Sequence, residues 1–196
     1  MKRLFDITAS FLGLILLSPF LITISFLIIL TMPGPILFRQ QRVGKNRKLF
    51  KLNKFRSMSV KKGSEKGHFD IGDKSRITKL GRILRKFKLD ELPQLFNVLV
   101  GDMSLVGPRP EVQKWTEIYP EKWDIVLKVK PGITDNASIF FRNEEEILAN
   151  SCSPEKTYEL ELLPKKLDYY INYVNNNSFW GDIKIIFRTF HIIITK

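Results

Sequence analysis

The sequence predicts a predominantly helical α/β protein with a single domain that is attached to a membrane by its N-terminus. Three features support this: a long uncharged run near the N-terminus, a basic segment in which apolar residues alternate, and C-terminal apolar residues at helical spacing. A chain of 196 residues that is 44% hydrophobic has enough material for one core. Its single cysteine, Cys152, excludes an internal disulfide and favours a reducing, cytosol-facing location.

Residues 1–38 are expected to form a membrane-embedded helix. No charged residue occurs from Ile7 to Phe38, and about 20 apolar residues suffice to span a bilayer core. Pro19 removes a backbone donor near the middle, so a break or kink is expected at Ser18-Pro19. Cations flank both ends, which favours a re-entrant helix with both ends on the cytoplasmic side. A kinked spanning helix fits these residues equally well.

Residues 39–196 are expected to form the domain on the cytoplasmic face, beginning with a β-hairpin. The pieces "ILFRQQRVG" and "KLFKLNKFRSM" alternate apolar and basic residues around a turn at Gly44-Lys45-Asn46. Lys54 and Arg56, near the end of the second strand, are candidates for binding phosphate. Residues 60–75 are polar and glycine-containing and are predicted to form a mobile loop.

The net charge of +12 is concentrated in one block. Residues 39–91 hold eighteen Lys or Arg and five Asp or Glu, a net of +13. This block predicts a polyanionic partner: nucleic acid, anionic lipid or a phosphorylated substrate.

Two acids follow this block at a predicted helix start. Apolar residues at spacings of three and four predict a helix before them: Ile77, Leu80, Leu84 and Phe87. Pro93 then begins a second helix that Gly101 ends, so Asp90 and Glu91 lie at or just before its N-terminus. Capping needs one acid, which leaves the other to hold Mg²⁺ or to attack phosphorus. An ordinary capped helix is the commoner meaning of such a pair.

Two arginines are further phosphate candidates. In "GDMSLVGPRP" the prolines on either side of Arg109 restrict it to an extended conformation, from which a guanidinium can bind phosphate through two nitrogens. The alternative is a structural ion pair with an acid such as Asp102. Arg85, about one helical turn before the acidic pair, is the second candidate.

The C-terminal region contains two amphipathic stretches separated by "NNNS". One runs from Leu167 to Val174, and the other, which is rich in aromatic residues, runs from Phe179 to Phe190. Aromatics beside cations suit a membrane interface, although a packed core is the commoner meaning of this pattern.

Several of these segments together resemble the bacterial sugar transferase family of small monotopic phosphoglycosyl transferases. The resemblance runs in order through "KRLFDITASFLGLILLSPF", "PGPILFRQQRVGKNRKLFKLNKFRSM", "KLDELPQLFNVLVGDMSLVGPRPEV" and "KPGIT", and "YYINYVNNNSFWGDIKIIFRT" fits the tail. The resemblance covers essentially the whole catalytic unit of this family. Several long motifs that occur in the same order make the match highly specific.

The resemblance implies an enzyme that begins capsule, O-antigen or glycoprotein glycan assembly at the cytoplasmic face of the bacterial inner membrane. Asp90 would attack the β-phosphate of a UDP-sugar, release UMP and pass the sugar-phosphate to polyprenyl phosphate, for example undecaprenyl phosphate. Glu91, with Asp90, would hold Mg²⁺, and Arg109 would bind phosphate. The family's broken membrane helix matches Ser18-Pro19 and favours the re-entrant form. Membrane lipids and other glycan-assembly enzymes are the further partners expected, and nucleic acid is not.

One segment departs from the family pattern. Many relatives have Pro-Gly-Ile-Thr-Gly-Trp-Ala-Gln where this chain has "PGITDNASI", so the identity of the sugar does not transfer. Asp135, Asn136 and Arg142 are the candidate nucleotide-sugar contacts in this region. Two other classes of protein compete with the transferase: a membrane-anchored nucleic-acid binder, which leaves the acidic pair unexplained, and a non-catalytic scaffold for glycan enzymes.

Overall fold

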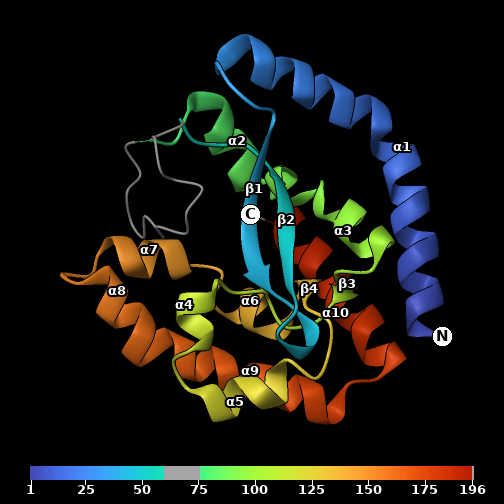
Figure 1. Cartoon of the computed structure of the whole chain (residues 1–196). Coiled ribbons are helices and arrows are strands. Elements are labelled where there is room, and N and C mark those ends of the chain that lie inside the picture. Colours follow the sequence, from blue (N-terminus) through green and yellow to red (C-terminus); the bar gives the residue numbers. More distant parts are fainter. Residues whose placement is uncertain (60–75, 196) are drawn as a thin grey trace.

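The computed structural model describes residues 1–59 and 76–195 and shows a helical domain wrapped on one side by a long N-terminal helix (Figure 1). The predicted loop at 60–75 lies outside the described residues. The longer elements are α1 (Lys2–Thr31), β1 (Leu37–Val43), β2 (Leu49–Phe55), α2 (Lys79–Lys86), α3 (Gln94–Val100), α9 (Leu163–Asn176) and α10 (Phe179–Ile194). The shorter ones are η1 (Lys45–Arg47), η3 (Leu89–Glu91), β3 (Ser104–Val106), α4 (Gln113–Thr116), α5 (Pro120–Val126), β4 (Gly132–Thr134), α6 (Asn136–Phe140), α7 (Glu144–Ala149), α8 (Pro154–Thr157) and η4 (Tyr158–Leu162).

Helix α1 continues through Pro19 and bends near its middle (Figure 1). Proline cannot donate to the carbonyl four residues earlier, which is that of Ile15. The Ser18 hydroxyl donates to this carbonyl over 2.7 Å and so replaces the missing bond. Among the described residues, α1 is the one helix that is long and apolar enough to cross a membrane.

The two halves of α1 contact different parts of the domain. Beyond the bend, Ile24 and Ile28 are buried against Phe55 of β2 and Leu84 of α2. Near the N-terminus, Arg3 donates to the carbonyls of Val98 and Leu99 over 2.6 and 2.9 Å, which holds α1 to the end of α3. Large apolar side chains remain exposed along the rest of the helix, among them Phe11, Leu12, Leu16, Ile22, Phe26 and Leu30.

The predicted hairpin is confirmed. Strands β1 and β2 pair antiparallel, from Leu37 opposite Phe55 to Val43 opposite Leu49. The turn is a short 3₁₀ segment in which Asn46 takes a left-handed conformation, with φ of 55°. A second, parallel pair, β3 and β4, was not predicted, because strands of three residues are too short to show a period.

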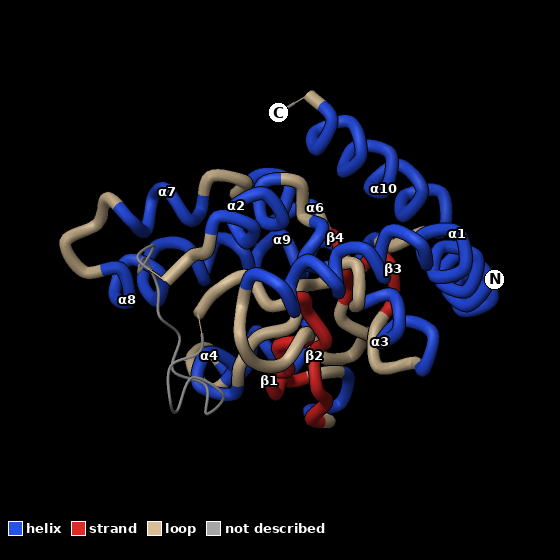
Figure 2. The backbone as a smooth tube through the Cα atoms, turned by 90° about the horizontal axis from the view of Figure 1, so that it is seen from above, coloured by secondary structure: helices blue, strands red, loops and turns tan. Residues whose placement is uncertain are grey.

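The two C-terminal helices differ in what their apolar faces contact. Helix α9 lies in the main core, where Leu163, Leu167 and Tyr170 are fully buried. Helix α10 runs from beside the start of α1 towards the C-terminus, away from the hairpin (Figure 2). Its aromatics Trp180, Phe187 and Phe190 are exposed. Helix α9 is therefore a core helix, whereas the exposed aromatics of α10 fit the predicted position at a membrane interface.

Candidate active site

The acidic pair occupies a tight turn between two helices, close to the predicted position. Asp90 and Glu91 lie in η3, after α2 and before α3, and both are buried. Lys88, just before η3, has a left-handed backbone with φ of 56°, which is uncommon for a residue other than glycine. Gly101, with φ of 100°, ends α3 as predicted.

Lys54 projects from β2 towards both acids. Its Nζ lies 2.9 Å from Asp90 Oδ2 and 3.5 Å from Glu91 Oε1. The contact with Asp90 is an ion pair without hydrogen-bond geometry, and neither Asp90 oxygen has a hydrogen-bond partner among the described residues. Asp90 is only 1% exposed, so its carboxylate is desolvated and incompletely partnered. A buried polar group in this state is uncommon and points to a ligand or a reaction.

Arg109 is held in place by the backbone on both sides of it. Gly107 N donates to the Thr134 carbonyl over 3.1 Å, and Gly132 N donates to the Pro108 carbonyl over 2.9 Å. The two glycines touch so closely that a Cβ added to Gly132 would lie 2.1 Å from Gly107 N. The loop carrying Arg109 is therefore fixed against β4.

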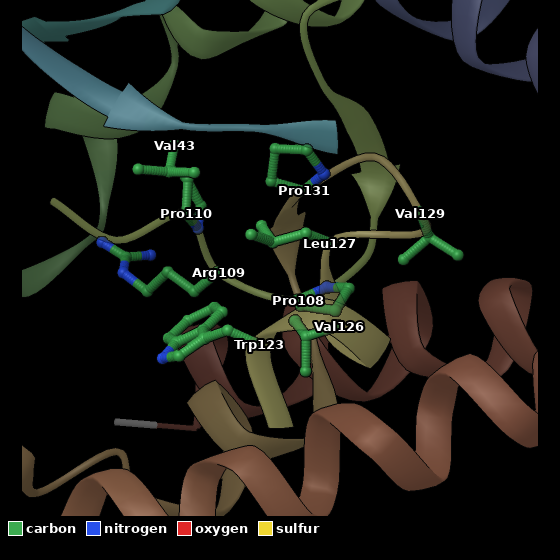
Figure 3. Close-up of a pocket in the computed structure, with 9 residues that line it drawn as sticks. All are labelled: Val43, Pro108, Arg109, Pro110, Trp123, Val126, Leu127, Val129 and Pro131. Atoms are coloured by element: carbon green, nitrogen blue, oxygen red, sulfur yellow. The ribbon is translucent and has the colours of Figure 1, made fainter. Parts of the chain in front are cut away.

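Figure 3 shows that the guanidinium of Arg109 points away from the apolar side chains of Leu127 and Pro131, which line a small cavity with it. The cavity lined by these residues and Trp123 measures about 10 Å³, room for roughly one water molecule. The indole nitrogen of Trp123 is buried and has no hydrogen-bond partner among the described residues. The cavity is too small for a sugar or a nucleotide.

Arg109 binds Glu91 through two nitrogens. Nη2 donates to Oε1 over 2.6 Å and Nη1 to Oε2 over 3.3 Å. Burial raises the pKa of Glu91, but the charges of Arg109 and Lys54 outweigh it and hold that pKa well below its ordinary value. Lys88 adds to this effect. Glu91 also raises the pKa of Arg109, so the pair stays charged. The alternative partner predicted for Arg109, Asp102, instead accepts a hydrogen bond from Asn97 over 3.3 Å.

The structure gives Arg56 and Arg85 contacts other than the predicted ones. Arg56 is buried and donates to the carbonyls of Met32 and Pro33, which places its guanidinium at the end of α1 instead of among the acids. Arg85 forms an ion pair with Glu145 of α7. The pKa of Glu145 is lowered because the charges of Arg85, Lys88 and Lys54 outweigh the effect of burial, so the Arg85 pair lies close to the acid cluster.

The predicted nucleotide-sugar contacts occupy different environments. Asp135 is buried and caps α6, accepting hydrogen bonds from the nitrogen and hydroxyl of Ser138 over 2.9 and 2.5 Å. Burial raises the pKa of Asp135. Asn136 is partly exposed at the start of α6, and Arg142 is exposed between α6 and α7. Asp135 therefore has a structural role, whereas the other two remain accessible.

A buried polar network beside Arg109 was missed by sequence reasoning. Glu111 accepts a hydrogen bond from the Tyr158 hydroxyl over 2.5 Å and lies 3.3 Å from Arg42 Nη1. Lys166 lies 3.6 Å from Glu111 and 3.1 Å from Glu144. The one available signal was that Glu111 directly follows the "PRP" segment. Partners 22 to 69 residues apart in the sequence cannot be paired from spacing.

The two acids give a partial fit to a magnesium site. No group of three or more Asp, Glu, His or Cys that could hold a metal occurs in the described part of the chain. Mg²⁺ nevertheless commonly takes one or two protein carboxylates and completes its shell with water and substrate phosphate. Asp90, with both oxygens lacking hydrogen bonds, fits such a role, whereas the oxygens of Glu91 are engaged by Arg109 and would have to be released to take part.

Comparison with known proteins identifies the family. The model for "Bacterial sugar transferase" matches residues 1–196. The chain belongs to the bacterial sugar transferase family. The whole described fold, from α1 to α10, is therefore that of a bacterial sugar transferase.

Several bacterial sugar transferases are similar over nearly the full chain. A UDP-glucose:undecaprenyl-phosphate glucose-1-phosphate transferase of Klebsiella pneumoniae is 43% identical over 96% of this chain and 39% of its own length. A UDP-N-acetylgalactosamine-undecaprenyl-phosphate N-acetylgalactosaminephosphotransferase of Aeromonas hydrophila is 34% identical over 99% of the chain and 44% of its own length. An uncharacterized sugar transferase of Bacillus subtilis (strain 168) is 40% identical over 100% of the chain and 88% of its own length. The chain thus spans less than half of the first two relatives.

Proposed function

We propose that this chain is a phosphoglycosyl transferase that moves a sugar-1-phosphate from a UDP-sugar to a polyprenyl phosphate such as undecaprenyl phosphate. The observation that carries the proposal is the buried Asp90, whose oxygens lack hydrogen bonds although two cations, Lys54 and Arg109, flank the acidic pair. The activities for which the Klebsiella and Aeromonas relatives are named support the same reaction class.

The reaction would proceed in two displacements. An Asp90 oxygen attacks the β-phosphorus of the UDP-sugar, the bond from that phosphorus to the bridging oxygen breaks, and UMP leaves with the electron pair. A phosphate oxygen of the polyprenyl phosphate then attacks the same phosphorus and releases the Asp90 carboxylate. A covalent acyl-phosphate divides one difficult transfer into two easier steps.

Three side chains would support these steps. Arg109 offers two donors fixed in one plane, which suits a phosphate that displaces Glu91 from it. Lys54 stabilises negative charge beside Asp90. Asp90 and Glu91 would hold Mg²⁺, which when bound supplies neutralisation of the diphosphate charge.

The location proposed is the cytoplasmic face of a bacterial inner membrane, with α1 re-entrant at Ser18-Pro19. The exposed apolar surface of α1 and its central bend support this (Figure 1). A polyprenyl acceptor is itself confined to the bilayer, so an enzyme held at its surface meets both substrates. The reaction would be the first membrane step in making a capsule, O-antigen or related glycan, next to other glycan-assembly enzymes.

The test is UMP release from a panel of UDP-sugars with Mg²⁺ and polyprenyl phosphate. Wild type should release UMP continuously from at least one UDP-sugar, and this sustained release should require both Mg²⁺ and polyprenyl phosphate. Asp90→Asn should lower the rate by about 10³-fold or more, the order of magnitude expected for loss of a nucleophile. Salt-sensitive retention of RNA or DNA without UMP release would favour the nucleic-acid binder. Glycan assembly in cells that persists with Asp90→Asn would favour the scaffold.

A further inference from the structure

A second hollow lies on the side of the hairpin away from the acidic pair. It is a shallow groove of about 390 Å³ between β2 and α3. Arg39, Lys51 and Asn53 line it, and Lys54, which contacts Asp90, follows Asn53 along the strand. Successive side chains of a strand point to opposite faces, so a ligand in this groove would be separated from Asp90 by β2.

The groove combines cations with apolar surface. Arg39 and Lys51 are exposed, and neither forms an ion pair within the described residues. The opposite wall carries Phe96 and Val100 of α3, which are 53% and 54% exposed. Asp102, at one end, is engaged with Asn97. The ionised residues that line the groove, Arg39, Lys51 and Asp102, therefore sum to a net charge of +1, beside apolar side chains that a soluble protein would tend to cover.

The groove adjoins the membrane helix. In both Figure 1 and Figure 2, α3 lies between β2 and α1. Arg3 of α1 donates to the last carbonyls of α3, and a Cβ added to Gly13 of α1 would lie 3.5 Å from Leu95. Apolar chains that extend from the groove would therefore continue onto the exposed apolar surface of α1.

We propose that this groove binds the headgroup of an anionic phospholipid, with its phosphate at Arg39 and Lys51 and its acyl chains passing over Phe96 and Val100 towards α1. The volume suits a headgroup and not a whole lipid. Each cation near an anionic membrane surface raises the binding affinity by a factor of about five. The site would fix the domain against the bilayer and goes beyond the transfer reaction, on which it does not depend.

The test is native mass spectrometry of the full chain in detergent containing equal amounts of phosphatidylglycerol and phosphatidylcholine. Wild type should retain one phosphatidylglycerol in preference to phosphatidylcholine. The double variant Arg39→Gln/Lys51→Gln should lose this preference by roughly 25-fold, and Phe96→Ser should weaken retention of phosphatidylglycerol. Lys156→Gln, an exposed cation on α8, is the matched control and should behave as wild type.

Three outcomes would overturn the proposal. One is equal retention of the two lipids by wild type. Another is unchanged preference in the double variant, with circular dichroism showing it folded. The third is displacement of the lipid by inorganic phosphate or by an oligonucleotide at matched charge, which would make the groove a general anion site. Because lipid retention is read without turnover, a chain that releases no UMP can still pass this test, and an active enzyme can still fail it.

Discussion

Arg109 Nη2 lies 2.6 Å from Glu91 Oε1, and this contact links the two motifs that resemble a sugar transferase site, "DE" and "PRP". The pair is buried on the Glu91 side and 31% exposed on the Arg109 side chain. It therefore stabilises the loop around Arg109 while the Arg109 side chain stays partly exposed.

Removing the Glu91 charge should change how stability depends on pH. The pKa of Glu91 is lower in the folded chain than in the unfolded one, so its contribution is present above about pH 4.3 and is lost as the pH falls towards the folded value. Glu91→Gln should lower the free energy of unfolding by about 2 kcal/mol at pH 7, a buried-pair effect reduced by the exposure of Arg109. Urea denaturation in detergent at pH 7 and at about pH 3, inside the window between the unfolded and folded pKa values of Glu91, measures both. A constant difference between wild type and variant across this range would contradict the assignment.

Glu145 should compete with the substrate diphosphate for Arg85. Their ion pair joins α2 to α7 near the acid cluster, and the Glu145 side chain is 65% exposed, so the pair is weak and exchangeable. Under the proposed function, Glu145→Gln should lower the KM for the UDP-sugar up to about fivefold and leave kcat unchanged. Glu146→Gln, the exposed neighbour, is the control. A KM that does not change, or rises, would mean that Arg85 does not meet the substrate.

The buried network behind Arg109 should be essential for stability. Lys166 is 3% exposed and lies between Glu111 and Glu144, so Lys166→Met would leave Glu144 without its cation and Glu111 with Arg42 alone. We expect a loss of about 3 kcal/mol in the free energy of unfolding. Lys165→Met, an exposed neighbour on the same helix, should cost less than about 0.5 kcal/mol. Denaturation curves for the two variants that coincide would contradict the role given to Lys166.

The bend in α1 should place both ends of the helix on one side of the membrane. Cys152 is exposed on the catalytic domain and serves as a natural reporter for that side. A second reporter is a cysteine in a short N-terminal extension of a Cys152→Ser chain. An impermeant thiol reagent applied to oriented vesicles should label both from the cytoplasmic side. Labelling from opposite sides would establish a spanning helix instead.

Features of the fold that follow from local chemistry were predictable. The alternation around Gly44 predicted the hairpin, and Pro19 predicted a disturbance of α1. The rescue of the Ile15 carbonyl by Ser18 follows from the same local chemistry. The parallel pair β3 and β4 was not predictable, because its three-residue strands show no period and pair across 28 residues of sequence, Ser104 with Gly132 and Val106 with Thr134.

The site was predictable in composition more than in geometry. Spacing placed Asp90 and Glu91 at a helix start, and Arg109 does lie beside them. Arg56 was assigned to phosphate because it lies two residues after Lys54, but its side chain turns to the carbonyls at the end of α1. The ion pair between Arg85 and Glu145 was not predicted, since a sequence cannot show that α7 lies near α2.

The central claim, that Asp90 carries the sugar-phosphate, is tested most directly by intact mass spectrometry of the chain incubated with a UDP-sugar and Mg²⁺ without polyprenyl phosphate. We predict that wild type gains the mass of one sugar-phosphate, that peptide mapping locates it on Asp90, that adding polyprenyl phosphate removes it, and that Asp90→Asn gains none. Turnover by wild type with no such adduct on any time scale, or full turnover by Asp90→Asn, would contradict the account.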